Sequence, residues 1–214
     1  MKALIIKDLA ITRNQTKLIL LLAIICVFMA FVNETAFTIG YMGLLLALLA
    51  LGTISYDDYD HGYSFLFSLP ITKTTYVIEK YLFCLASSFV GVLIGVIATS
   101  VANLINGTGL DISGTLSDGI IMILLSMIMV SIMIPLRIKY GTENGKIVSG
   151  IILGALFAGI LLFRDRLLLL LIRVDKISEG LTPTILILLF ALITIIAISI
   201  SFFISIKVIN NKEF

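Results

Sequence analysis

The sequence has a single histidine, only two cysteines and no phosphate-binding loop, and each scarcity excludes a kind of chemistry. A zinc site needs at least three protein ligands, so His61 alone nearly excludes an intramembrane metalloprotease, and we expect it to be an exposed loop residue. Cys26 and Cys84 both lie in apolar stretches and are interpreted as small buried hydrophobic residues. Without a Gly-x-x-x-x-Gly-Lys-Ser/Thr motif, the chain does not bind ATP in the P-loop manner. We therefore predict no catalytic, metal or cofactor site.

Charge is also scarce, and this scarcity identifies the solvent. Only 13% of the 214 residues are charged and 60% are hydrophobic, with a mean hydropathy of +1.18. Soluble domains carry about 25% charged residues, and a domain this small could not hide so much apolar surface from water. The net charge of +2 is too low to indicate nucleic-acid binding. We predict an all-α membrane protein in which residues 1–214 form a single transmembrane domain.

Six segments approach the roughly 20 apolar residues that a spanning helix needs. They are 18–32, 37–54, 81–105, 119–138, 147–163 and 183–206. Signal-peptide cleavage near Ala30 or Ala36 is an alternative for the first segment. The long, basic N-terminal region argues against it, as does the odd number of helices that cleavage would leave.

The basic residues predict the orientation. With both termini cytoplasmic, eleven of the fifteen Lys and Arg residues lie on the inner side, as the positive-inside rule requires. The stretch from Lys2 to Lys17 interleaves apolar and charged residues and predicts an interfacial helix.

The last outer connection breaks the pattern, because charged residues flank a short apolar run there. We expect short extracellular helices, acting either as an ordinary amphipathic loop or as an external gate. The candidate gate residues are Leu167, Leu168, Leu169, Leu170 and Leu171.

The interiors of the six predicted spans hold no ionisable residue, which argues against a proton-coupled transporter. Few polar side chains lie in the spans, which argues against a channel. Gly91 with Gly95, and Gly150 with Gly154, form small-residue motifs suited either to packing within the chain or to a subunit interface.

The loop between the second and third spans is the most informative cytoplasmic stretch. It begins with Asp57, Asp58 and Asp60, and after Gly62 becomes apolar and aromatic with Phe65, Leu66, Phe67 and Leu69. Pro70 then ends the run, and Thr72 or Thr74 is the expected N-cap of the following helix. The apolar patch is explained either by burial against the inner lipid headgroups or by docking in a groove of a soluble partner.

Two loops carry a resemblance to a known family. The stretch just described, continuing through Ser68-Leu69-Pro70 to Lys80-Tyr81, resembles the coupling-helix region of bacterial ABC-type export permeases, most closely the small peptide-export subfamily. The loop between the fourth and fifth spans, with Pro135 followed by Lys139, Tyr140, Gly141 and Glu143, is similar to a second motif of that family. Asn144 departs from the pattern, since a basic residue is expected there.

This resemblance implies the membrane-spanning subunit of an ATP-driven exporter in the bacterial inner membrane. Two soluble P-loop ATPase subunits would bind ATP and Mg²⁺ and accept the apolar patch in a groove, with the aspartates at its rim. A second permease copy, identical or related, would complete the unit. An apolar path suits a hydrophobic or amphipathic peptide, or a lipid-like molecule. The alternative is a membrane immunity or sensor protein that binds amphipathic peptides without ATP.

Overall fold

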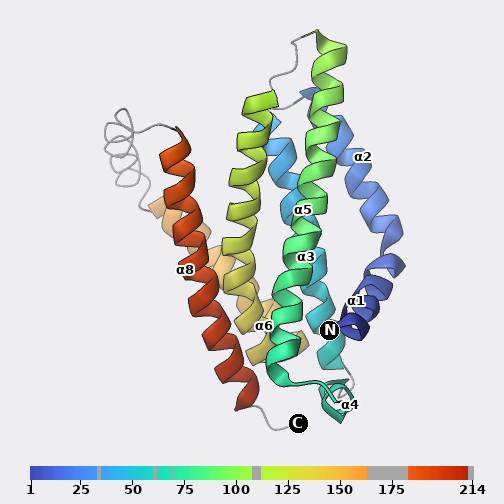
Figure 1. Cartoon of the computed structure of the whole chain (residues 1–214), viewed down its shortest axis with the longest axis vertical. Helices are drawn as coiled ribbons and strands as arrows, with labels where there is room; N and C mark the ends of the chain where they lie inside the picture. Colours follow the sequence, from blue (N-terminus) through green and yellow to red (C-terminus); the bar gives the residue numbers. More distant parts are fainter. Residues whose placement is uncertain (33–34, 60–61, 69, 108–111, 163–182, 212–214) are drawn as a thin grey trace.

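The structure is a computed structural model that describes residues 1–32, 35–59, 62–68, 70–107, 112–162 and 183–211. Between 142 and 162 it describes the backbone and only some of the side chains. The described part is helical and contains no strand, which confirms the all-α class. Figure 1 shows the helices as a bundle in which α1, α4 and the C-terminal end of α8 lie at one end, here called the α4 end. Their bounds are α1 Lys2–Asn14, α2 Thr16–Val32, α3 Thr35–Asp58, α4 Gly62–Ser68, α5 Lys73–Asn106, α6 Ile112–Leu162 and α8 Pro183–Asn210.

Four helical segments in the described part are long and apolar enough to cross a membrane. They are Thr35–Asp58, Lys73–Asn106, Ile112–Gly141 and Thr184–Asn210. A fifth is added if α1 and α2, which meet at an angle of 68°, are taken together as one bent span. The multi-pass membrane character is therefore supported, whereas the expected count of six is not confirmed.

Two expected spans account for the difference in the count. The segment 18–32 falls in α2, whose 17 residues are about 25 Å long, short of a hydrocarbon core of about 30 Å. The segment 147–163 follows a break in α6, and its last residue lies outside the described part of the chain. Residues 164–182, which were expected to form the outer helices, lie outside it altogether.

The start of α5 confirms the predicted N-cap. The Thr72 side chain accepts a hydrogen bond from the Thr75 backbone N–H at 3.2 Å. The ammonium group of Lys73 donates to the carbonyl oxygen of Ile209 at 3.0 Å, near the end of α8. A cation is favourable there, because the last carbonyl groups of a helix lack partners within the helix.

The centre of the bundle is the pair α3 and α5, which pack closely through glycine. A Cβ atom on Gly91 would lie 2.5 Å from the Met42 carbonyl oxygen, and one on Gly95 would lie 2.8 Å from the Ile39 Cα. Lipid provides no hydrophobic drive for helix association, so backbones gain attraction by approaching where side chains are absent. Gly91 and Gly95 therefore lie at a contact within the chain.

The second glycine pair is placed differently. A Cβ atom on Gly150 or on Gly154 would meet nothing within 4 Å in the described structure. A role for this pair in a subunit interface stays a prediction.

Hydroxyl groups join α5, α6 and α8 at several levels. The hydroxyls of Ser88 and Ser126 lie 2.5 Å apart, and that of Tyr81 lies 2.5 Å from Ser201 and 3.2 Å from Ser205. Pairing of this kind satisfies polar atoms that lipid would leave without partners. The contacts of Tyr81 hold α8, which otherwise exposes much of its apolar surface.

The glycine contact gives a first prediction. Gly95→Ala should lower the free energy of unfolding by about 1–3 kcal/mol, because the added methyl group forces α5 away from α3. Gly150→Ala is the matched control and should cost nothing, because its surroundings are open. Cys26 and Cys84 are buried free thiols, so a thiol-reactive dye reports unfolding in detergent directly. Equal melting temperatures for the two variants would contradict the proposed contact.

Candidate functional site

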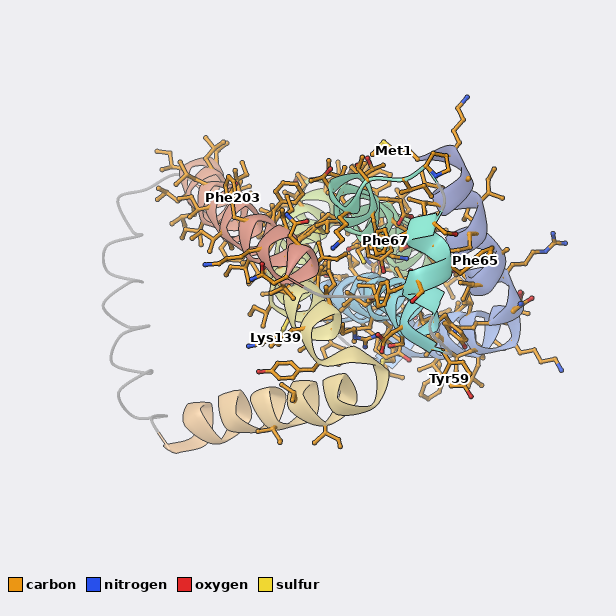
Figure 2. All side chains as sticks on the ribbon, turned by 90° about the horizontal axis from the view of Figure 1, so that it is seen from below. Met1, Tyr59, Phe65, Phe67, Lys139 and Phe203 are labelled. Atoms are coloured by element: carbon orange, nitrogen blue, oxygen red, sulfur yellow. The ribbon has the colours of Figure 1, made fainter. Side chains whose placement is uncertain are left out.

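The short helix α4 lies against the bundle with one face and exposes the other. Tyr63 and Leu66 are buried, whereas the side chain of Phe65 is 73% exposed. Figure 2 shows Phe65 and Phe67 on opposite sides of α4. The patch predicted from the sequence is thus divided. Leu66 anchors α4, Phe67 is partly buried on the anchored side, and Phe65 remains for an external contact.

Aromatic rings fix α4 to the first turns of α5. The ring of Tyr63 stacks on Phe67 with centroids 6.1 Å apart, and both rings meet Tyr76 edge-on at 5.9 Å. The hydroxyl of Tyr76 donates to Asp57 Oδ2 at 3.0 Å. Burial raises the pKa of the Tyr63 hydroxyl well above its ordinary value, and the nearby carboxylates of Asp57 and Asp58 raise it further. Tyr63 therefore stays neutral and acts as a packing group.

A buried ion network lies directly beneath this aromatic cluster. The Lys80 ammonium group, in α5, is 2.5 Å from Asp8 Oδ2 in α1 and 2.7 Å from Asp57 Oδ2 in α3. Lys7 pairs with the second oxygen of Asp57 and lies 3.2 Å from Asp8 Oδ1. Thr53 donates to Asp8 at 2.9 Å. Lys80 and Asp8 are fully buried, so each charge depends on these partners to offset the loss of water.

This network is what sequence reasoning missed. Asp57, expected at the rim of an ATPase groove, is 5% exposed and makes ion pairs within its own chain. Asp8, taken for the polar side of an interfacial helix, faces the bundle together with Leu4. Their spacing of four residues places Leu4 and Asp8 on one face of α1, and this was the signal available in the sequence.

A groove of about 390 Å³ separates α1 from α4. Apolar residues of the two helices form most of its wall, and Lys7 and Asp57 contribute polar atoms. Phe65, Leu66 and Gly62 border it on the α4 side. The groove and the exposed ring of Phe65 thus form one continuous surface at the α4 end.

The second predicted loop meets the first at Gly141. Its backbone, with φ +72° and ψ −165°, lies in a region open essentially only to glycine and interrupts α6. A Cβ atom at this position would lie 2.5 Å from Asp58 Oδ2. Lys139 lies over the ring of Tyr140, 5.1 Å from its centroid. Two stretches far apart in the sequence, at Asp58 and Gly141, therefore touch.

The remaining predicted site residues lie outside what the structure describes. This holds for Asp60, Leu69 and the candidate gate residues Leu167, Leu168, Leu169, Leu170 and Leu171, and for the side chain of Glu143. Within the described residues, no group of three or more His, Cys, Asp or Glu side chains is arranged to hold a metal ion.

A bundle of long apolar helices with a short helix and a groove at one end is the arrangement of a multi-pass membrane protein. Comparison with protein families identifies the class: residues 3–210 match the model of the ABC-2 family transporter protein, and the chain belongs to that family. It is therefore a membrane subunit of the transport type, generally not an enzyme itself, and its family implies association with an ABC ATPase. Comparisons with curated proteins and with solved structures gave no match.

The contact between the two loops gives the next prediction. Gly141→Ala should lower the free energy of unfolding by about 1–3 kcal/mol, because alanine is strained at this φ and ψ and its methyl group meets Asp58. Gly52→Ala, where a Cβ atom meets nothing within 4 Å, is the control. Melting of the single variants and of Gly141→Ala/Asp58→Ala forms a double-mutant cycle. A penalty that is the same with and without Asp58 would show that the two loops do not touch.

Proposed function

We propose that this chain is the membrane-spanning permease subunit of an ATP-driven exporter and that a separate P-loop ATPase docks at α4. The observation that carries the proposal is the position of Phe65, an exposed aromatic side chain beside an apolar groove at the end of an ABC-2 family membrane protein. ATP and Mg²⁺ are bound by the ATPase. Two ATPase subunits and a second permease copy, identical or related, complete the working unit.

The chemistry of the groove supports a protein helix as the docked element. An amphipathic helix inserts apolar side chains into a groove and keeps its polar side chains at the rim. Here the wall is mostly apolar, and Lys7 and Asp57 provide polar atoms to orient such a helix. An exposed aromatic side chain such as Phe65, once a partner covers it, contributes a large share of the binding energy in interfaces of this kind.

The α4 end supports the orientation predicted from the basic residues. Helix α1 and the end of α8 lie there, and Lys73 binds a carbonyl oxygen near the end of α8, so this end carries basic residues that the positive-inside rule assigns to the cytoplasm. An ATPase that uses cellular ATP must dock on that side. We therefore place the protein in the bacterial inner membrane with both termini cytoplasmic.

Apolar cavities at the other end support a hydrophobic or amphipathic cargo, either a peptide of the kind moved by the peptide-export subfamily or a lipid-like molecule. One of about 370 Å³ lies between α6 and α8 and is bordered by Ile121, Leu186 and Phe190. A second, of about 320 Å³, lies between α3 and α6. A sugar or an ion would find few polar partners in either cavity.

The alternative is an immunity or sensor protein that binds amphipathic peptides and uses no ATP. The apolar cavities fit this function as well. The exposed Phe65 and the groove beside it distinguish the two candidates, because only the exporter requires a docked ATPase.

Phe65→Asp tests the docking proposal. It should weaken binding of the ATPase about 30-fold or more, as expected when a central aromatic anchor is lost. Leu66 is unsuitable because it is buried, and a charge there would disturb the fold. The measurement is the affinity of the permease, in nanodiscs, for the P-loop ATPase that co-purifies with the parent protein.

Phe65→Leu, which keeps an apolar side chain, is the matched control and should bind nearly as well as the parent protein. Unchanged binding of Phe65→Asp would show that α4 is not the contact. If the parent protein binds the ATPase at no measurable level and still binds amphipathic peptides, the immunity or sensor function is favoured.

A further inference from the structure

The ion network beneath α4 connects three helices in a closed arrangement. Lys7 and Asp57 join α1 to α3, Lys80 and Asp8 join α5 to α1, and Lys80 and Asp57 join α3 to α5. Each pair of helices therefore has its own ion pair. The two pairs that involve α1 join residues far apart in the sequence: Lys7 and Asp57 are 50 positions apart, and Asp8 and Lys80 are 72. None of the three helices can shift alone without separating a buried pair.

The network brackets α4 on both sides. Asp57 lies in the last turn of α3, just before α4, and Tyr76 and Lys80 lie in the first turns of α5, just after it. A Cβ atom on Gly62, the first residue of α4, would lie 2.6 Å from the carbonyl oxygen of Asp57. The start of α4 thus lies against the backbone of Asp57, and its aromatic rings pack on Tyr76, whose hydroxyl donates to the side chain of Asp57.

Buried ion pairs contribute little to stability but exclude other arrangements. Removing charges from water costs several kcal/mol per ion, and well-packed apolar groups in their place are often equally stable. Any displaced arrangement leaves a buried charge without its partner, which is far more costly. The network therefore selects one relative position of α1, α3 and α5, a role that apolar packing fills less strictly.

Lys80 is the centre of the network because the acidic groups outnumber the fully buried cations. Glu79 is also fully buried, and its Oε2 lies 3.8 Å from the Lys80 ammonium group. Lys7 is one-third exposed, whereas Lys80 is sealed among the carboxylates. Removing Lys80 alone would leave three buried carboxylates dependent on Lys7.

We propose that Lys80 is a positioning residue that couples α4 to α1, so that a displacement of α4 by the ATPase moves α1, α3 and α5 as one unit. Its action passes through Asp8 and Asp57, and it touches neither ATP nor substrate. The coupling role rests on the proposed exporter function, whereas the fixed position of α1 relative to α4 is a property of this chain alone.

The first experiment uses the permease alone in nanodiscs. Cys26 and Cys84 are replaced by alanine, and cysteines that carry the spin labels are introduced as Asn14→Cys in α1 and Ser68→Cys in α4, where both parent residues are exposed. Pulsed electron paramagnetic resonance then gives the distribution of distances between the two labels. A neutral network variant, Asp8→Asn/Asp57→Asn/Glu79→Gln/Lys80→Met, removes all four fully or nearly fully buried charges and leaves only Lys7, which is one-third exposed. It should insert and melt like the parent protein but show a broadened distribution. A distribution as narrow as that of the parent would overturn the proposal.

Lys73→Met is the matched control, because Lys73 is a lysine of the same helix that binds carbonyl oxygens of α8 instead of the network. It should leave the distribution unchanged. If the network variant does not fold, Asp8→Ala takes its place, since it breaks the link from Lys80 to α1 while Lys80 and Lys7 both keep Asp57 as a partner. Broadening in Asp8→Ala supports the proposal, and an unchanged distribution overturns it.

The second experiment adds the ATPase and separates coupling from docking. The neutral network variant should bind the ATPase like the parent protein and lose transport, whereas Phe65→Asp should lose binding itself. Full transport by a variant with a broadened distribution would overturn the coupling role. If the parent protein binds no ATPase, the exporter function fails, and the distances in the permease alone still decide whether the network positions α1.

Discussion

The arrangement at the α4 end depends on one constraint, that a fully buried lysine must keep its carboxylates. Lys80 lies among Asp8 and Asp57 with no exposed surface, and its charge is tolerated only because both acids are within ion-pair distance. This requirement explains why α1 turns the charged Asp8 towards the bundle and leaves the apolar side chains of Ile6 and Leu9 exposed, the reverse of what apolar burial alone would favour. It also explains why the end of α3 and the start of α5, which flank α4, lie together.

The glycine contact between α3 and α5 supplies the rigid base for this network. Gly91 and Gly95 allow the two backbones to approach more closely than any side chain would permit. The charged cluster lies on the same pair of helices, nearer the α4 end, where Lys80 follows the start of α5 and Asp57 precedes the end of α3. Close packing in the apolar part and the ion pairs thus hold the same two helices together at different levels.

Much of the fold could be predicted because it depends on local properties. Long apolar stretches predict helices, and Thr72 is recognisable as an N-cap from the residues beside it. The site was predicted less completely, because neighbouring residues of one type have different surroundings. Asp57 is sealed against Lys80, whereas Asp58 meets Gly141, and nothing in the sequence distinguishes the two aspartates. Phe65 and Leu66 differ likewise, since adjacent positions of a short helix point about 100° apart and only the position of the bundle determines which is buried.

The two adjacent aspartates connect the segment before α4 to α1 and α5 on one side and to α6 on the other. Through Asp57, the segment before α4 is joined to α1 and α5, and through Asp58 it touches the break in α6. The guanidinium group of Arg137, one turn before that break, donates to the carbonyl oxygen of Leu51 in α3 at 2.9 Å, so α6 is held to the same helix. A displacement of α4 by the proposed ATPase would therefore be passed to α6 through the contact of Asp58 with Gly141. It would be passed to α1 through the ion pairs of Asp57 and Lys80. The first connection depends on shape and the second on charge, so the proposed coupling would use two independent kinds of contact.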